Sequence, residues 1–118
     1  MDTLDVTAKF PSEGHVVLEV GGFVDTNTAP ELERALIEHG AAATEAVVLD
    51  LHAVDYISSA GWGVMISVVS NFRDRGVDLR LAAMRREVDQ VYQLLEFPSI
   101  LRAYPNLQEA LEATNASS

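Results

Sequence analysis

The chain contains no cysteine. This absence excludes disulfides, thiolate nucleophiles and cysteine-ligated metal sites together. The three histidines, His15, His39 and His52, are isolated from one another and have no second ligand at helical or strand spacing, so no metal centre is expected. Asp50 and His52 are two residues apart on a predicted strand and can share a face, which favours a structural histidine over a metal ligand.

Basic residues are also scarce, with 8 Lys and Arg against 18 Asp and Glu and a formal net charge of −10. Such a field repels nucleic acid and disfavours an anionic membrane surface. The acidity either serves solubility or steers a partner that has a basic docking face. No apolar run approaches the roughly 20 residues that span a bilayer, and the N-terminus lacks the features of a secretory signal, so a cytoplasmic protein is expected.

The motifs of common catalytic sites are missing as well. Ser58 and Ser59 lack the G-x-S-x-G elbow of the α/β-hydrolases. The Gly61-Trp62-Gly63 segment has no third glycine and no P-loop Lys-Ser/Thr pair, so it does not predict a phosphate-binding loop. The sequence therefore predicts a binding protein rather than an enzyme, with no cofactor.

The hydrophobic pattern predicts one α/β domain over residues 1–118, because the chain is long enough for one core and too short for two. Alternation over residues 4–10 and its return at 15–20 indicate a hairpin, and Gly21-Gly22 indicate a bulge or a sharp exit. Thr28 and Glu31 have capping-box spacing before a helix that we expect to stop at Gly40.

The second half continues the same alternation of strand and helix. Further strands are predicted at residues 46–51, 77–82 and 100–101, and further helices at 59–75, 88–95 and 107–111. Gly76 should stop the first of these helices, and Asn106 with Glu109 should cap the last. The expected product is a small mixed sheet of four or five strands with about four helices, an ordered core at about residues 4–113, and a frayed end at 114–118.

The stretch VVLDLHAVDYISSAGWGVMISVV, residues 47–69, is the centre of this pattern. It reads as a buried strand, a short polar link and a helix that begins at Ser58-Ser59-Ala60-Gly61. One of the two serines can simply be the N-cap, which stabilises a helix by about 1 kcal/mol. A hydroxyl at a helix start is also a suitable phosphate acceptor, because free N–H groups and the positive end of the dipole receive the phosphate.

A helical wheel places Val64, Val68, Gly61, Phe72 and Met65 on the side of this helix that faces the sheet. Trp62 falls on the flank, together with Ile66 and Val69. A tryptophan in that position is either part of the core or an exposed anchor for a partner, and the wheel leaves both interpretations open.

The run Val47 to Leu51, followed by Val54-Asp55-Tyr56-Ile57-Ser58-Ser59-Ala60-Gly61-Trp62-Gly63-Val64, resembles the STAS domain of bacterial anti-sigma factor antagonists. The turn Gly22-Phe23-Val24-Asp25-Thr26-Asn27-Thr28-Ala29 is similar to the turn after the family's second strand. The resemblance implies a partner-switching protein whose unphosphorylated form binds an anti-sigma factor. That partner is also a serine kinase with a histidine-kinase-like ATPase fold, and binding frees its client.

By the same resemblance, phosphorylation at the start of the second helix ends binding, and a PP2C-type phosphatase resets the switch. Ser59 aligns with the phosphoacceptor, while Ser58 stands where an Asp is usual and remains an alternative acceptor. The resemblance implies a monomer or weak homodimer with these partner-binding residues: Asp25, Thr26, Ser58, Ser59, Gly61, Trp62 and Ile66.

Two other functions fit the same pattern. The domain could be an accessory subunit of a lipid-transport or stressosome-like assembly, in which the helix start docks a protein without phosphorylation control. It could also be a small-ligand or nucleotide sensor, although the sequence has no phosphate loop.

Overall fold

The computed structural model describes residues 4–114 and confirms the predicted α/β class. Of the end predicted to fray, residues 114–118, only Thr114 lies within this range, and it has no regular secondary structure. In chain order the elements are β1 (Leu4–Ser12), β2 (His15–Val24), α1 (Ala29–Gly40), β3 (Ala46–Ile57), α2 (Ser59–Asp74), β4 (Asp78–Ala82), α3 (Arg86–Leu94), the 3₁₀ turn η1 (Phe97–Ser99), β5 (Arg102–Tyr104) and α4 (Leu107–Glu112).

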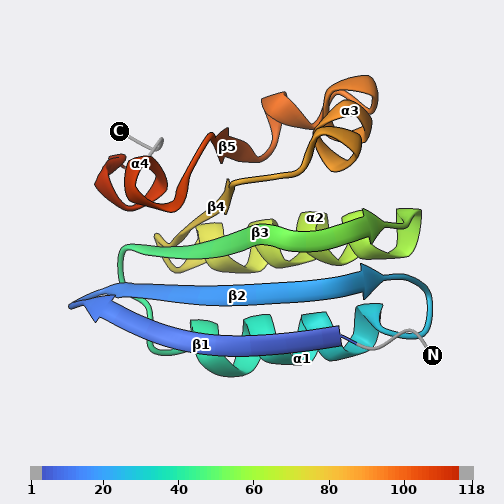
Figure 1. Ribbon diagram of the computed structural model, residues 1–118. Coiled ribbons are helices and arrows are strands. Elements are labelled where there is room, and N and C mark those ends of the chain that lie inside the picture. The colour runs from blue at the N-terminus through green and yellow to red at the C-terminus, as the bar shows by residue number, and fades with distance from the viewer. Residues whose placement is uncertain (1–3, 115–118) are drawn as a thin grey trace.

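The five strands form one mixed sheet in the order β1-β2-β3-β4-β5 (Figure 1). β1 and β2 are antiparallel, as expected for a hairpin. The pairs β2–β3, β3–β4 and β4–β5 are parallel, because a helix returns the chain between the strands of each pair. The carboxyl ends of β2, β3, β4 and β5 therefore all meet at one edge of the sheet.

The sheet has two differently covered faces. α1 and α2 cover one face, where the main core contains inward residues of β2 and β3 such as Leu18, Leu49 and Leu51 (Figure 1). A smaller cluster on the opposite face joins Val17 and Val48 to Ala110 of α4. On that second face α4 covers the β3–β4 part, so outward side chains of β1 and β2 such as Lys9 reach solvent. No helix among residues 4–114 is long and apolar enough to cross a membrane.

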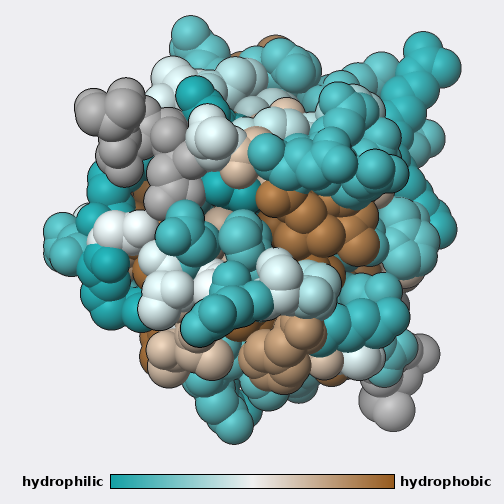
Figure 2. Space-filling model, turned by 90° about the vertical axis from the view of Figure 1, so that its left-hand side faces the viewer, coloured by the Kyte–Doolittle hydropathy of each residue, from teal (hydrophilic) through white to brown (hydrophobic). Residues whose placement is uncertain are grey.

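Figure 2 views the molecule from the end that carries the β1–β2 hairpin, on the left in Figure 1. This face is mostly hydrophilic, with a cluster of hydrophobic side chains within it. The carboxyl ends of β2 and β3, and the start of α2, lie at the other end of the sheet (Figure 1).

Several element boundaries differ from the sequence prediction. β3 does not end at Leu51 but continues to Ile57, because Val54 and Ile57 still reach the main core. β2 likewise continues through Gly21-Gly22 to Val24, and its register with β3 shifts on either side of the glycine pair, which confirms the predicted irregularity. The last strand forms at Arg102–Tyr104 rather than at residues 100–101.

The helix ends predicted at Gly40 and Gly76 and the cap predicted at Asn106 are confirmed. Gly76 has φ +74° just after α2, which confirms its stop role, and Asn106 Oδ1 accepts from Glu109 N at 2.8 Å, which confirms that cap. Gly40 is the last residue of α1, as predicted, and it is buried against the Phe72 ring of α2. The reason for a glycine there is therefore the close approach of two helices.

We predict opposite effects for two glycine-to-alanine substitutions. In Gly40→Ala the new Cβ would lie 2.5 Å from Phe72 Cζ, so the buried ring must move and the free energy of unfolding should fall by about 1–3 kcal/mol. Gly63→Ala is the matched control, because nothing lies within 4 Å of its new Cβ and helix propensity should raise stability by up to about 1 kcal/mol. Urea denaturation measures both. Equal stability of Gly40→Ala and the parent would contradict the close approach.

Candidate functional site

The candidate site lies at the carboxyl ends of β2 and β3, which are neighbouring parallel strands. Val24 is in register with Ile57, and Ser58 N donates to Val24 O at 2.7 Å. This bond joins the two strand ends just before the chain turns away on both sides. The turn that begins at Asp25 and the Ser58-Ser59 junction therefore lie beside one another, so these predicted partner-binding residues are close enough to form one site.

Asp25 organises the turn before α1. Its Oδ1 accepts from Asn27 N at 2.9 Å and from Thr28 N at 3.0 Å. The Thr28 hydroxyl donates to Phe23 O at 2.7 Å and accepts from Asp25 N at 2.9 Å. The predicted Thr28–Glu31 capping box is wrong, because Thr28 has helical backbone angles and its side chain turns back into the turn instead of capping the helix. Asp25 is half-buried, and Thr26 beside it is exposed.

The two serines have different environments. Ser58 has an extended backbone, with φ −79° and ψ 171°, and its Oγ accepts from Gly61 N at 3.3 Å, so Ser58 is the N-cap of α2. Ser59 is the first residue of the helix, and it is exposed. Among residues 4–114 its hydroxyl has no hydrogen-bond partner. The fold therefore uses Ser58 for capping and leaves the Ser59 hydroxyl accessible.

Gly61 is buried, and it brings α2 close to both strand ends. A Cβ at this position would lie 2.6 Å from Val24 Cγ1 and 2.8 Å from Ile57 Cγ2. The residue was predicted to contact a partner. Its burial corrects that prediction, since the absence of a side chain serves packing beneath the junction.

Trp62 is not an exposed anchor, so this part of the prediction is wrong. Only 2% of the residue is exposed, and its ring stacks on Phe97 at 4.9 Å and lies 6.2 Å from the Tyr92 ring. The helical wheel could not distinguish the two interpretations, because α3 and η1 cover this flank of α2 and come from a distant part of the sequence. Ile66, one turn on, is half-buried and also packs against the core.

The indole Nε1 of Trp62 has no hydrogen-bond partner in the described part of the chain. Trp62 also lines a small cavity of about 40 Å³, to which Asp55 and Glu87 contribute. A space of this size holds one water molecule. The cavity lies between the carboxyl end of β3, which precedes Ser58, and α3.

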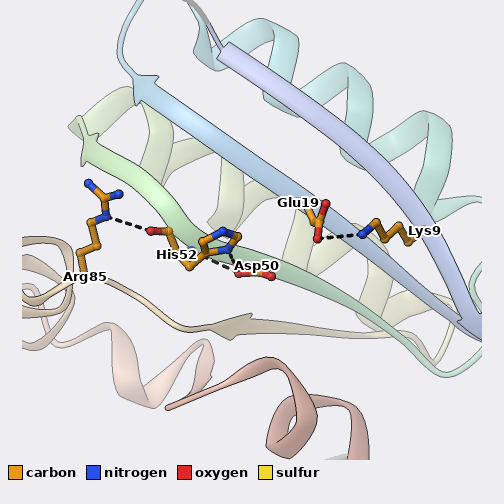
Figure 3. A network of polar contacts seen from close by, with 5 residues as sticks. All are labelled: Lys9, Glu19, Asp50, His52 and Arg85. Atoms are coloured by element: carbon orange, nitrogen blue, oxygen red, sulfur yellow. Dashed lines mark hydrogen bonds and ion pairs between the residues drawn. The ribbon is translucent and has the colours of Figure 1, made fainter.

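Charged side chains on the outer face of the sheet are paired with one another (Figure 3). His52 Nδ1 lies 2.8 Å from Asp50 Oδ1, which confirms that the two residues share a face, and Lys9 pairs with Glu19 at 3.1 Å. Arg85, at the start of α3, donates from Nε to His52 O at 2.8 Å and from Nη1 to Asp55. Asp55 therefore already has a cationic partner. No group of three or more His, Asp or Glu within residues 4–114 is placed to hold a metal ion.

An exposed aromatic pair next to the junction was missed by the sequence prediction. Phe23 of β2 is 38% exposed and Tyr56 of β3 is 50% exposed; their rings lie 6.5 Å apart and the two residues are in register. Val24 and Ile57 point into the core, so their neighbours Phe23 and Tyr56 point to the opposite face. The sequence did contain the signal, a large aromatic residue at an outward strand position. It was missed because the predicted strands ended at residues 20 and 51, before Phe23 and Tyr56.

Most of the chain is similar to proteins of one family. The STAS domain family model matches residues 9–110. BtrV of Bordetella bronchiseptica, named as a candidate anti-sigma factor antagonist, is 33% identical over 101 residues that cover 86% of each chain. The anti-sigma-F factor antagonist RsfB of Mycobacterium tuberculosis is 30% identical over 113 residues, which cover 93% of this chain and 88% of RsfB.

Solved structures agree at the level of the fold. The anti-sigma factor antagonist SpoIIAA in its unphosphorylated form superposes with a TM-score of 0.76 at 14% identity, covering 92% of this chain and 94% of that one. The phosphorylated form of the Bacillus protein gives a TM-score of 0.66 at 13% identity, covering 92% and 97%. With the family model matched from β1 to α4, the chain belongs to the STAS domain family.

Proposed function

We propose that the domain is an anti-sigma factor antagonist in a partner-switching pathway. It binds an anti-sigma factor that is also a serine kinase with a histidine-kinase-like ATPase fold, and this binding frees the kinase's client. Phosphorylation of Ser59 ends the binding, and a PP2C-type phosphatase restores it. The names of the relatives BtrV and RsfB support the first part of this proposal, and the existence of SpoIIAA in two phosphorylation states supports the second.

The observation that carries the proposal is the different placement of the two serines. Ser58 is occupied as the N-cap, whereas Ser59 presents an exposed, unbonded hydroxyl on the first turn of α2. A phosphate on Ser59 would lie near the free N–H groups and the positive end of the helix dipole, so it need not unfold the domain. It would instead add a charge of about −2 to the surface that a partner contacts.

The local charges strengthen the effect of such a phosphate. Asp25 lies in the neighbouring turn and has no basic partner within residues 4–114, while Asp55 is already paired with Arg85. Asp25 is therefore the carboxylate that would add to the phosphate charge. A partner with a basic docking face would be attracted to the unmodified surface. The added phosphate would change the charge of that surface by about −2 and so disturb the contacts of the complex.

The docking surface that we propose combines Phe23, Thr26, Tyr56 and Ser59. The two aromatic rings supply apolar area next to the phosphorylation site, and aromatic residues are enriched in the energetically important centres of interfaces. Trp62 and Gly61 are buried, so they support this surface by packing α2 against the core and do not contact the partner.

Phosphopeptide mapping tests the acceptor. After incubation with the partner kinase and ATP, we expect phosphate on Ser59, retained in Ser58→Ala and lost in Ser59→Ala. The Ser58→Ala variant should lose about 1 kcal/mol of stability because its cap is gone. Phosphate found on Ser58 alone, or on neither serine, would contradict the assignment of Ser59 as the acceptor.

Replacement of Ser59 by a carboxylate tests the switch. Ser59→Asp should weaken binding to the anti-sigma factor between about tenfold and a hundredfold, which corresponds to roughly 1.4–3 kcal/mol. Ser59→Ala should bind as the parent does, and calorimetric titration compares the three proteins. Unchanged binding of Ser59→Asp would indicate instead a docking subunit that is not controlled by phosphorylation.

Truncation of the aromatic pair tests the docking surface. Tyr56→Ala and Phe23→Ala should each lower affinity for the anti-sigma factor by about tenfold or more. Phe10→Ala is the matched control, because Phe10 is 60% exposed but lies near the hairpin at the other end of the sheet. Equal affinities of the Tyr56→Ala and Phe10→Ala variants would place the interface elsewhere.

A further inference from the structure

A cavity of about 580 Å³ lies between α3, η1 and β5 and shares no residue with the proposed docking surface. Its volume is within the range of small-molecule sites, roughly 300–1,000 Å³. It is open at the carboxyl ends of β4 and β5, the position at which parallel α/β sheets bind ligands. The lining residues that the argument uses are Met84, Asp89, Tyr92, Arg102, Ala103 and Tyr104.

Two opposite charges line this cavity without neutralising each other. Asp89 is half-buried on α3 and Arg102 is exposed on β5, and neither has an ion-pair partner among residues 4–114. A carboxylate and a guanidinium held apart in one cavity match a ligand that carries both charges. Arginine is well suited to bind a carboxylate through two parallel hydrogen bonds.

Two tyrosines form part of the wall of this cavity. The Tyr104 hydroxyl is buried and has no partner in the described part of the chain, a state that costs free energy. The Tyr92 hydroxyl donates to Leu101 O, which fixes the position of the ring in the cavity wall. Burial, with smaller contributions from Asp89 and Tyr104, raises the pKa of Tyr92, so its phenol stays neutral.

We propose that this cavity binds a small zwitterion of the class of free amino acids with an apolar side chain. Arg102 binds the carboxylate, Asp89 binds the ammonium group, and Met84 and Ala103 contact the apolar part. A nucleotide fits less well, because Asp89 repels phosphate and the cavity has only one arginine among its lining residues.

The structure supplies its own reporter for this site. Trp62 is the only tryptophan of the chain, and its ring lies 6.2 Å from the ring of Tyr92, which lines the cavity. A ligand that contacts Tyr92 should therefore change the fluorescence of Trp62. This readout needs no anti-sigma factor, so its result is independent of the proposed function.

The test is a fluorescence titration of the full chain with leucine, supported by calorimetry, up to roughly 10 mM, above the millimolar Kd of weak ligands. Two analogues are the matched controls: 3-methylbutylamine, which lacks the carboxylate of leucine, and 4-methylpentanoate, which lacks its ammonium group. We expect saturable binding of leucine and at least about tenfold weaker binding of each analogue. The absence of saturable binding by leucine, phenylalanine and methionine would overturn the proposal.

Substitutions then locate the site. Asp89→Asn and Arg102→Gln should each weaken leucine binding by about tenfold or more, since each removes one charged hydrogen bond. Arg86→Gln is the control, because Arg86 is exposed on α3 and does not line the cavity. Leucine binding that is the same in all three variants would overturn the proposal, because the ligand would then bind elsewhere.

Discussion

The hydrogen bond from Ser58 N to Val24 O joins the ends of β2 and β3, and the candidate site depends on it. A parallel pair brings its two carboxyl ends to one edge, so the turns that leave these ends lie side by side. Gly61 then allows α2 to begin in contact with Val24 and Ile57. A side chain at Gly61 would push the first turn of α2, and Ser59 with it, away from the Asp25 turn.

The core beneath the junction is aromatic. Trp62 of the first turn of α2 packs on Phe97 and Tyr92, so the accessible Ser59 lies on a helix turn that is packed into the core. A surface held in place by packing has little ordering entropy to lose when a partner binds. The same stack places Tyr92 between the junction and the cavity beside β5.

The acidic side chains of this negatively charged chain differ in whether a basic side chain lies next to them. On the outer face of the sheet, Asp50 is hydrogen-bonded to the His52 imidazole and Asp55 forms an ion pair with Arg85. At the junction, Asp25 uses its carboxylate to accept backbone N–H groups and has no basic partner within residues 4–114. A new negative charge on the first turn of α2 would therefore be repelled mainly by the Asp25 carboxylate, because the nearby Asp55 carboxylate is paired with Arg85.

The sequence by itself determined the features that depend on neighbouring residues. The N-cap at Ser58, the stop at Gly76 and the cap at Asn106 follow from side chains that bond to the backbone within a few positions. Hydrophobic periodicity gave the order of elements and the class of fold for the same reason, although it ended β3 too early.

Only the tertiary structure decided the features that depend on residues far apart in the chain. Trp62 is buried because α3 and η1 cover the flank of α2, and Gly40 is required because Phe72 of another helix packs on it. Phe23 and Tyr56 form an exposed pair because two parallel strands place them in register. The pattern of one helix or strand shows which of its side chains are apolar. Whether those side chains are buried depends on which other element packs over them.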